Sequence, residues 1–116
     1  MTLIQQFRKG TTPVLILSVL LDEPKYGYQI MRELEQRQKG YFSMTAALLY
    51  PALHGLEQDG LISSEWRGEP GKHQRKYYQI TPKGQQTLKI QMIEWEKFMT
   101  NLFQVTKPGE GGLISP

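Results

Sequence analysis

The residues with the clearest chemical potential lie in a short cationic segment, residues 67–76. It contains one acidic residue, Glu69, and four basic residues: Arg67, Lys72, Arg75 and Lys76. Four positive charges less one negative charge give +3, which equals the net charge of the whole chain, so the remaining sequence is close to neutral. Lysine and arginine bind nucleic-acid phosphates, although a solvated surface loop has the same composition. The segment therefore predicts either a phosphate-binding protrusion or an ordinary charged loop.

Other kinds of functional site have little support in the sequence. The two histidines, His54 and His73, lie in separate elements without metal-ligand spacing, and no cysteine is present to form a disulfide or a thiolate ligand. No carboxylate pair, glycine-rich phosphate loop or nucleophile motif stands out. We therefore expect a protein that is not an enzyme and that binds no metal or cofactor.

Length and composition are those of one globular domain. The chain has 116 residues, of which 39% are hydrophobic and 22% charged, values that exclude a disordered protein. The longest apolar run, VLILSVLL at residues 14–21, is too short to span a membrane, which needs about 20 residues. We therefore expect a cytoplasmic protein with no membrane partner.

That apolar run has the pattern of a buried helix. Thr12 supplies an N-cap oxygen and Pro13 suits the first helical position, which predicts that the helix begins there. The run is apolar on nearly every side, so we expect the helix to be buried all round. Leu3, Ile4 and Phe7 before it indicate a further helical turn or two.

Two amphipathic helices are expected next, because apolar residues recur at helical spacing in each. Gly40 ends the first of these helices, and Asp59–Gly60 ends the second. Their expected bounds are about Tyr26–Gln38 and, after a cap at Ser43 or Thr45, up to Gly60, with core positions Leu49, Leu53 and Leu56.

A hairpin and a long helix follow. The segments LISSEW and KYYQIT have strand composition and flank a Gly- and Pro-containing loop that is too long for a two-residue turn. Thr81–Pro82 repeats the helix-start signal. Helices followed by a basic hairpin form the winged version of the helix-turn-helix, whose third helix reads DNA. The predicted fold class is mainly α with a small β-hairpin: a winged helix-turn-helix over residues 1–80, a C-terminal dimerisation helix over 81–104 and a flexible tail over 105–116.

The fourth helix carries a heptad seam of apolar residues. Intervals of 4, 3, 4 and 3 residues separate its members, which is the spacing of a coiled-coil interface. One such helix has no partner for its seam within a small winged domain, so we expect a homodimer. Two-fold symmetry would place two reader helices about one DNA turn, ~34 Å, apart. The expected interface residues are Leu88, Met92, Trp95, Met99 and Leu102.

The side of the reader helix opposite its core leucines is the predicted DNA-contacting surface. Thr45 and Ala46 are small enough to let the backbone approach base edges. Tyr50 either donates its hydroxyl to a phosphate or is a half-buried packing residue. His54 either contacts a phosphate or is a neutral surface histidine. In the hairpin, the residues expected to meet phosphates or to reach the minor groove are Lys72, His73, Arg75 and Lys76.

The reader helix contains two residues that helices usually avoid, Pro51 and Gly55. One hypothesis is that the missing donor of Pro51 frees the carbonyl of Ala47 and bends the helix toward a groove. The alternative is that Pro51 is tolerated on a solvated face. The absence of a Cβ at Gly55 would allow close approach of a neighbouring helix.

Three stretches resemble the signature segments of PadR-type transcriptional regulators. They are YGYQI at residues 26–30, LLYPALHGLEQDGLI at 48–62 and KHQRKYYQITPKG at 72–84. Their order and spacing also match, and the resemblance covers roughly residues 9–103. In length the chain is similar to the short subgroup with a single C-terminal helix. Family members often carry Lys or Arg at the positions of His54 and Gly55, so weaker phosphate contacts from the reader helix are expected here.

The resemblance implies a sequence-specific dimeric repressor that binds double-stranded DNA at an inverted-repeat operator. It also favours Tyr28 as a contact to the DNA backbone. Some short PadR-type regulators bind aromatic drugs at the dimer centre, which implies a small planar aromatic effector at Trp95, with Val14 and Met92 as neighbours. The alternative for Trp95 is a plain aromatic residue of the dimer core.

A winged domain used only for protein–protein contact is the alternative function. Binding to promoter DNA that weakens steeply with salt would favour the regulator. Salt-insensitive capture of a protein partner would favour the interaction module.

Overall fold

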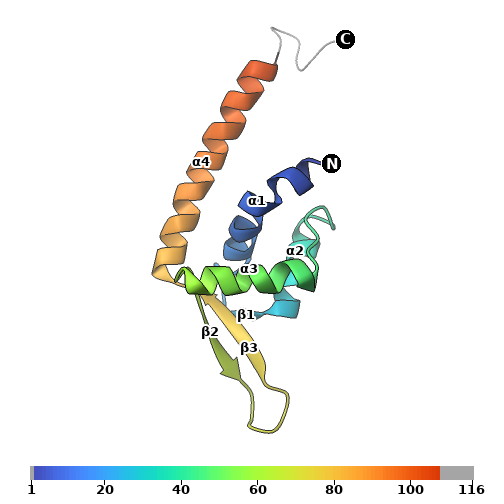
Figure 1. Ribbon diagram of the computed structural model, residues 1–116, viewed down its shortest axis with the longest axis vertical. Helices are drawn as coiled ribbons and strands as arrows, with labels where there is room; N and C mark the ends of the chain where they lie inside the picture. Colours follow the sequence, from blue (N-terminus) through green and yellow to red (C-terminus); the bar gives the residue numbers. More distant parts are fainter. Residues whose placement is uncertain (1, 108–116) are drawn as a thin grey trace.

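The computed structural model describes residues 2–107, which form four α-helices and a three-stranded antiparallel sheet (Figure 1). The strands lie in the order β1–β3–β2. The fold is mainly helical with a small sheet, as predicted, and its element order is that of a winged helix-turn-helix followed by one long helix. The elements are α1 (Leu3–Val19), β1 (Lys25–Tyr26), α2 (Gly27–Arg37), α3 (Ala46–Gln58), β2 (Ile62–Arg67), β3 (Arg75–Ile80) and α4 (Pro82–Thr106).

The first helix, α1, begins at Leu3. Thr2 forms a capping box with Gln5, in which each side chain accepts a hydrogen bond from the other residue's backbone N–H. This arrangement satisfies donors that a helix start leaves free. Pro13 lies inside the helix, where it removes one hydrogen bond to the preceding turn without ending the helix. The predicted start at Thr12–Pro13 is therefore wrong, because the cap at Thr2 begins the same helix earlier.

The hydrophobic core lies where the first three helices meet the sheet. The leucines predicted to face inward from α3 are all buried, and Leu88 extends the core to the first turns of α4. The apolar run of α1 is largely buried as expected, although Leu21, which lies beyond the end of the helix, is exposed. The largest fully buried side chains are Ile16, Leu17, Val19, Leu20, Ile30, Leu49, Leu53 and Ile62.

The sheet contains the predicted hairpin and one short strand that the sequence did not indicate. β1 has two residues, which are too few to show the alternation that identifies a strand. It adds to the free edge of β3 by antiparallel pairing. The registers are Lys25↔Tyr78 and Tyr26↔Tyr77 for β1 with β3, and Ile62↔Ile80 through Trp66↔Lys76 to Arg67↔Arg75 for β2 with β3.

Lys25 connects β1 to the end of α1. Only 3% of its surface is exposed. Its ammonium group donates to the carbonyl of Val19 at 2.9 Å and to the carboxylate of Asp22 at 2.6 Å, and the Glu33 carboxylate lies 3.6 Å away. Because a buried ammonium is stable only with such partners, Lys25 holds the segment that leads into α2 in one position.

The fourth helix, α4, extends far beyond the rest of the domain (Figure 1). Thr81 caps it by accepting a hydrogen bond from the backbone N–H of Gly84, and Pro82 takes the first position as predicted. The helix ends at Thr106, two residues beyond its predicted end. Of the predicted tail, residues 108–116 lie outside the described residues. Within residues 2–107, no helix has both the length and the apolar character that crossing a membrane requires.

The two unusual residues of α3 lie on a continuous helix. α3 runs without interruption from Ala46 to Gln58, and Pro51 is exposed on its surface. This position favours tolerance on a solvated face over a bend that aims the helix. A Cβ added at Gly55 would meet nothing within 4 Å. The predicted close helix approach at Gly55 is therefore wrong within the chain, because that side of α3 faces open space.

Candidate nucleic-acid interface

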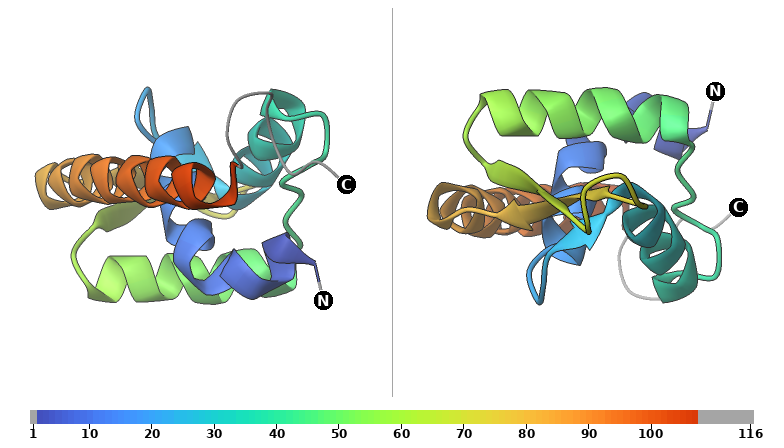
Figure 2. Two further views of the ribbon diagram at one scale, coloured as in Figure 1. Left: turned by 90° about the horizontal axis from the view of Figure 1, so that it is seen from above. Right: turned by 90° about the horizontal axis from the view of Figure 1, so that it is seen from below.

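α3 and the hairpin lie at one end of the molecule, opposite the free end of α4 (Figure 1). Seen from that end, α3 runs along one side, and the hairpin lies between it and the start of α2 (Figure 2). We call the hairpin, residues 62–80, the wing, and this end of the molecule the α3–wing face. The residues predicted to touch DNA from the helices are all exposed: Tyr28, Thr45, Ala46, Tyr50 and His54.

Tyr50 joins α3 to the start of α2. The Tyr50 ring lies against Gly27, where a Cβ would come within 2.8 Å of the ring carbon Cζ and still closer to the hydroxyl. Real Cβ atoms essentially never make such contacts, so a side chain at position 27 would force the Tyr50 ring to move, and the glycine of the YGY motif permits this close packing. Tyr50 nevertheless keeps 47% of its surface exposed. It is thus a half-buried packing residue, which is one of the two predicted roles, and its contact with a phosphate stays a prediction.

Tyrosine rings hold both arginines of the wing. The guanidinium of Arg75 lies 4.6 Å from the ring centre of Tyr26, and that of Arg67 lies 4.7 Å from the ring centre of Tyr77. The two rings meet edge to face, with centres 5.4 Å apart. Arginine can stack on a ring and still present its N–H donors to an anion. The array therefore orders cationic groups that a bare loop would leave mobile.

The wing tip beyond these rings is solvated. Lys72 is exposed, and its ammonium lies 3.4 Å from the carboxylate of Glu69, an exposed pair that contributes little to stability. His73 is also exposed. Both side chains are exposed, their contact with phosphates stays a prediction, and neither lines the groove that contains Tyr50.

Lys76 is engaged within the chain. Its ammonium lies 3.8 Å from the carboxylate of Glu57 on α3, and the same carboxylate accepts a 2.5 Å hydrogen bond from the Ser64 hydroxyl. Lys76 also lies 5.7 Å from the ring centre of Tyr78. Burial raises the pKa of the Tyr78 hydroxyl, and the charge of Glu57 adds to this effect. Lys76 thus links the wing to α3, a role that its charge alone did not indicate.

A groove of about 290 Å³ separates α3 from the wing. Tyr50 lies on the α3 side, and Arg75 and Lys76 lie on the wing side, so the structure brings three predicted residues together. It also brings in Trp66, which sequence reasoning overlooked although 65% of its surface is exposed. The complete lining is Tyr26, Gly27, Tyr50, Trp66, Gln74, Arg75, Lys76 and Tyr78.

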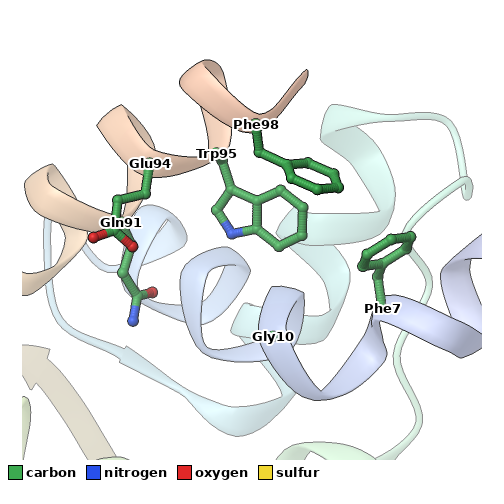
Figure 3. Close-up of a pocket in the computed structure, with 6 residues that line it drawn as sticks. All are labelled: Phe7, Gly10, Gln91, Glu94, Trp95 and Phe98. Atoms are coloured by element: carbon green, nitrogen blue, oxygen red, sulfur yellow. The ribbon is translucent and has the colours of Figure 1, made fainter. Parts of the chain in front are cut away.

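A second cavity, of about 360 Å³, lies between α1 and α4 and contains Trp95 (Figure 3). Three aromatic rings meet there edge to face: the Trp95 centre lies 5.8 Å from that of Phe7 and 5.9 Å from that of Phe98. Glu94 and Gln91 supply the polar part of the lining. The Gln91 side-chain oxygen is buried and has no hydrogen-bond partner among the described residues.

The neighbours predicted for Trp95 differ from those in the structure. Val14 is buried in the core and Met92 is exposed, and neither lines this cavity. Phe7 and Phe98 take their place, because α1 begins early enough for Phe7 to reach α4. Of the two acidic residues that the sequence places beside Trp95, Glu94 lines the cavity and Glu96 does not.

Comparisons with solved structures place this arrangement among bacterial regulators. A transcriptional regulator from Clostridium thermocellum superposes with a TM-score of 0.82 at 29% identity, covering 91% of this chain and all of that one. Bacillus subtilis PadR in complex with operator DNA superposes with a TM-score of 0.66 at 25% identity. That match covers 72% of this chain and 46% of the PadR chain.

Sequence comparisons give the same result. The transcriptional regulator Rv3488 of Mycobacterium tuberculosis is 34% identical over 85 residues, which are 73% of this chain and 76% of that protein. Proteins of this kind regulate transcription and are not enzymes, in agreement with the sequence-based expectation. The profile described as "Transcriptional regulator PadR-like family" matches residues 16–90. With well over half of its length matched, the chain belongs to the PadR-like family of transcriptional regulators.

Proposed function

We propose that this regulator is a repressor that binds an inverted-repeat operator as a homodimer. The observation that carries the proposal is the α3–wing face, where Tyr50 of the exposed side of α3 shares a groove with Arg75 and Lys76 of the wing. An exposed helix enters the major groove of DNA, and flanking cations bind the phosphates. A dimer bound across a promoter would exclude RNA polymerase, which is the physical basis of repression.

Each predicted contact has a distinct role in this proposal. Thr45 and Ala46 open the helix that approaches the base edges, while Tyr28, Tyr50 and His54 meet the backbone on either side. Lys72, His73 and Arg75 meet phosphates from the wing. Lys76 acts mainly through Glu57, by fixing the distance between the wing and α3.

Dimerisation through α4 is supported by its uncovered apolar surface. Contiguous exposed apolar side chains mark interaction surfaces. Exposed apolar residues recur along α4, which projects beyond the rest of the domain (Figure 1). Leu88 and Trp95 are covered by the same chain, whereas the other members of the seam are exposed. The exposed apolar residues of α4 are Ile90, Met92, Ile93, Phe98, Met99, Leu102, Phe103 and Val105.

The proposal is tested by sequencing the genomic DNA that the purified protein retains. The expected result is a motif with two inverted half-sites whose centres lie about one helical turn (~10 base pairs) apart, bound with an affinity that falls steeply with salt. Retention of no DNA, together with salt-insensitive capture of a protein, would instead support the interaction module.

The cavity at Trp95 favours a second activity, the binding of a small planar aromatic effector. Its three rings offer faces and edges for an aromatic guest, and the Glu94 carboxylate favours a cationic one. An effector that prefers the DNA-incompetent arrangement of the dimer would release the operator.

Fluorescence titration tests the effector site. Planar aromatic cations are added to Trp66→Phe protein, in which Trp95 is the remaining tryptophan, and quenching is expected for those that bind. Absence of quenching across a broad panel, or an unchanged response of a Trp95→Leu dimer to an inducer, would leave Trp95 as an ordinary core residue.

A further inference from the structure

Trp66 faces the reader helix from the wing. It lies in β2 opposite Lys76, and side chains two residues apart on a strand share a face, so Trp66 lies on the same side as Ser64. Ser64 donates to Glu57 of α3, which identifies that side as the one toward the helix. The indole lies in the outer half of the strand, where α3 no longer covers it, and 65% of its surface remains exposed.

The groove that Trp66 shares with Tyr50 has the chemistry of a nucleic-acid backbone site. Arg75 supplies a guanidinium that Tyr26 holds in place, and Gln74 supplies an amide. The charge of Lys76 is partly neutralised by Glu57. The groove therefore combines a few hydrogen-bond donors with two aromatic walls, which suits an alternation of anionic phosphates and apolar sugar faces.

We propose that Trp66 contacts DNA directly, with its indole face against a deoxyribose and its ring N–H donating to an adjacent phosphate. The inference rests on the proposed DNA binding by α3. With α3 in the major groove and the wing beyond it, the strand that borders this groove of the DNA crosses the space between α3 and the wing. That space is the 290 Å³ groove, and Trp66 is its most exposed aromatic side chain.

This contact differs from the cationic contacts of the wing in a measurable way. A phosphate neutralised by arginine releases counterions, so its loss flattens the dependence of affinity on salt. Indole packing on a sugar releases none. Loss of Trp66 should therefore weaken binding to every duplex while the salt slope stays unchanged, whereas Arg75→Ala should weaken binding and flatten the slope.

The direct test uses the wild-type sequence labelled with 5-fluorotryptophan, which gives one fluorine NMR signal for Trp66 and one for Trp95. Trp66→Phe assigns the signals. The probe is a mixed-sequence duplex of about three helical turns (~30 base pairs) in low salt. On binding, the Trp66 signal should lose most of its H2O/D2O solvent isotope shift, because DNA then covers the indole. The Trp95 signal, at the other end of the molecule, serves as the internal control.

Affinity measurements complete the test. Trp66→Ala should weaken duplex binding roughly tenfold, equivalent to about 1.4 kcal/mol, with unchanged circular dichroism. Trp66→Phe should retain part of the affinity, because it keeps the ring but loses the N–H. A Trp66 signal that stays solvent-exposed on bound DNA, or wild-type affinity in Trp66→Ala, would overturn the inference alone. If the wild-type protein binds no duplex at all, the proposed DNA binding is overturned as well.

Discussion

The α3–wing face and the projecting half of α4 are both exposed, but they differ in how their side chains are engaged. On the α3–wing face, Arg75 stacks on Tyr26 and Tyr50 lies on Gly27. On α4, Met92 and Met99 leave 46% and 37% of their surface exposed, although their spacing is that of an interface. The first surface is held in one arrangement by contacts within the chain. On the second surface, no other part of the described chain fully covers the apolar side chains of α4.

Under the proposed function, this difference would suit two kinds of partner. A stiff, charged duplex is met best by groups that are already ordered, since ordering them on binding costs conformational entropy. An apolar helix needs only a complementary apolar surface, which a second copy provides. Substitutions at the two surfaces should therefore fail in different ways.

The largest effect is expected from placing charge in the uncovered seam. Met92→Glu with Met99→Glu would bury four carboxylates in the proposed two-fold interface, at a cost of several kcal/mol for each unpaired charge. Light scattering should give a monomer, and operator binding should be lost. Lys97→Glu, an equally exposed position of α4 outside the seam, is the matched control. A wild-type monomer at micromolar concentration would contradict the contrast between the surfaces.

A smaller effect is expected from removing the outer cations of the wing. Lys72→Ala with Arg75→Ala should weaken binding to all duplexes alike and reduce the salt slope by about two phosphate contacts per subunit. The measurement is a salt titration of affinity on two unrelated duplexes. An effect confined to one sequence would mean that the wing reads bases.

Two glycine substitutions with opposite expected effects on the free energy of unfolding test the comparison further. Gly27→Ala places a methyl group against the Tyr50 ring and should destabilise the fold by about 1–3 kcal/mol, as overpacking does. Gly55→Ala meets open space in the same type of element and should stabilise it by about 0.5–1 kcal/mol. Urea unfolding of both variants provides the measurement. Equal effects on stability at the two positions would show that the Tyr50 ring moves away from a larger residue at position 27 at little cost.

The smallest effect is expected at Asp22, near the start of β1. The hydrogen bond from Lys25 lowers the pKa of the Asp22 carboxyl below its ordinary value of 3.8. A lowered folded-state pKa stabilises the fold above 3.8, and this contribution is lost as the pH falls through the folded-state pKa. Urea midpoints of wild type and Asp22→Asn should therefore differ at neutral pH and converge in strong acid. If the two urea midpoints still differ in strong acid, the difference in stability does not come from the charge of the Asp22 carboxylate.

The sequence predicted those parts of the molecule that depend on local pattern. The bounds of α2 and α3, the core leucines of α3, the hairpin and the Thr81–Pro82 start of α4 all follow from periodicity and capping. Its error at the start of α1 arose where two signals competed, since the Thr12–Pro13 pair is a valid start signal that a cap at Thr2 precedes.

The candidate sites were less predictable because they depend on contacts between distant segments. The pairing of Lys76 with Glu57, the contact of Tyr50 with Gly27 and the meeting of Phe7 with Trp95 each join separate elements. Residue type identified the cations of the wing, but it does not indicate which cation has a carboxylate beside it. Trp66 was overlooked because an exposed aromatic residue in a strand has the same sequence pattern as a buried one.

The contact between Tyr50 and Gly27 also bears on how such a regulator changes its target over generations. A larger residue at position 27 requires the Tyr50 ring to move or to be replaced by a smaller side chain, so substitutions at these two sites are coupled. Thr45 and Ala46, by contrast, are exposed at the start of α3. Under the proposed function, operator preference would therefore drift through the first turn of the helix, while the contact of Tyr50 with Gly27 keeps α3 packed against the start of α2.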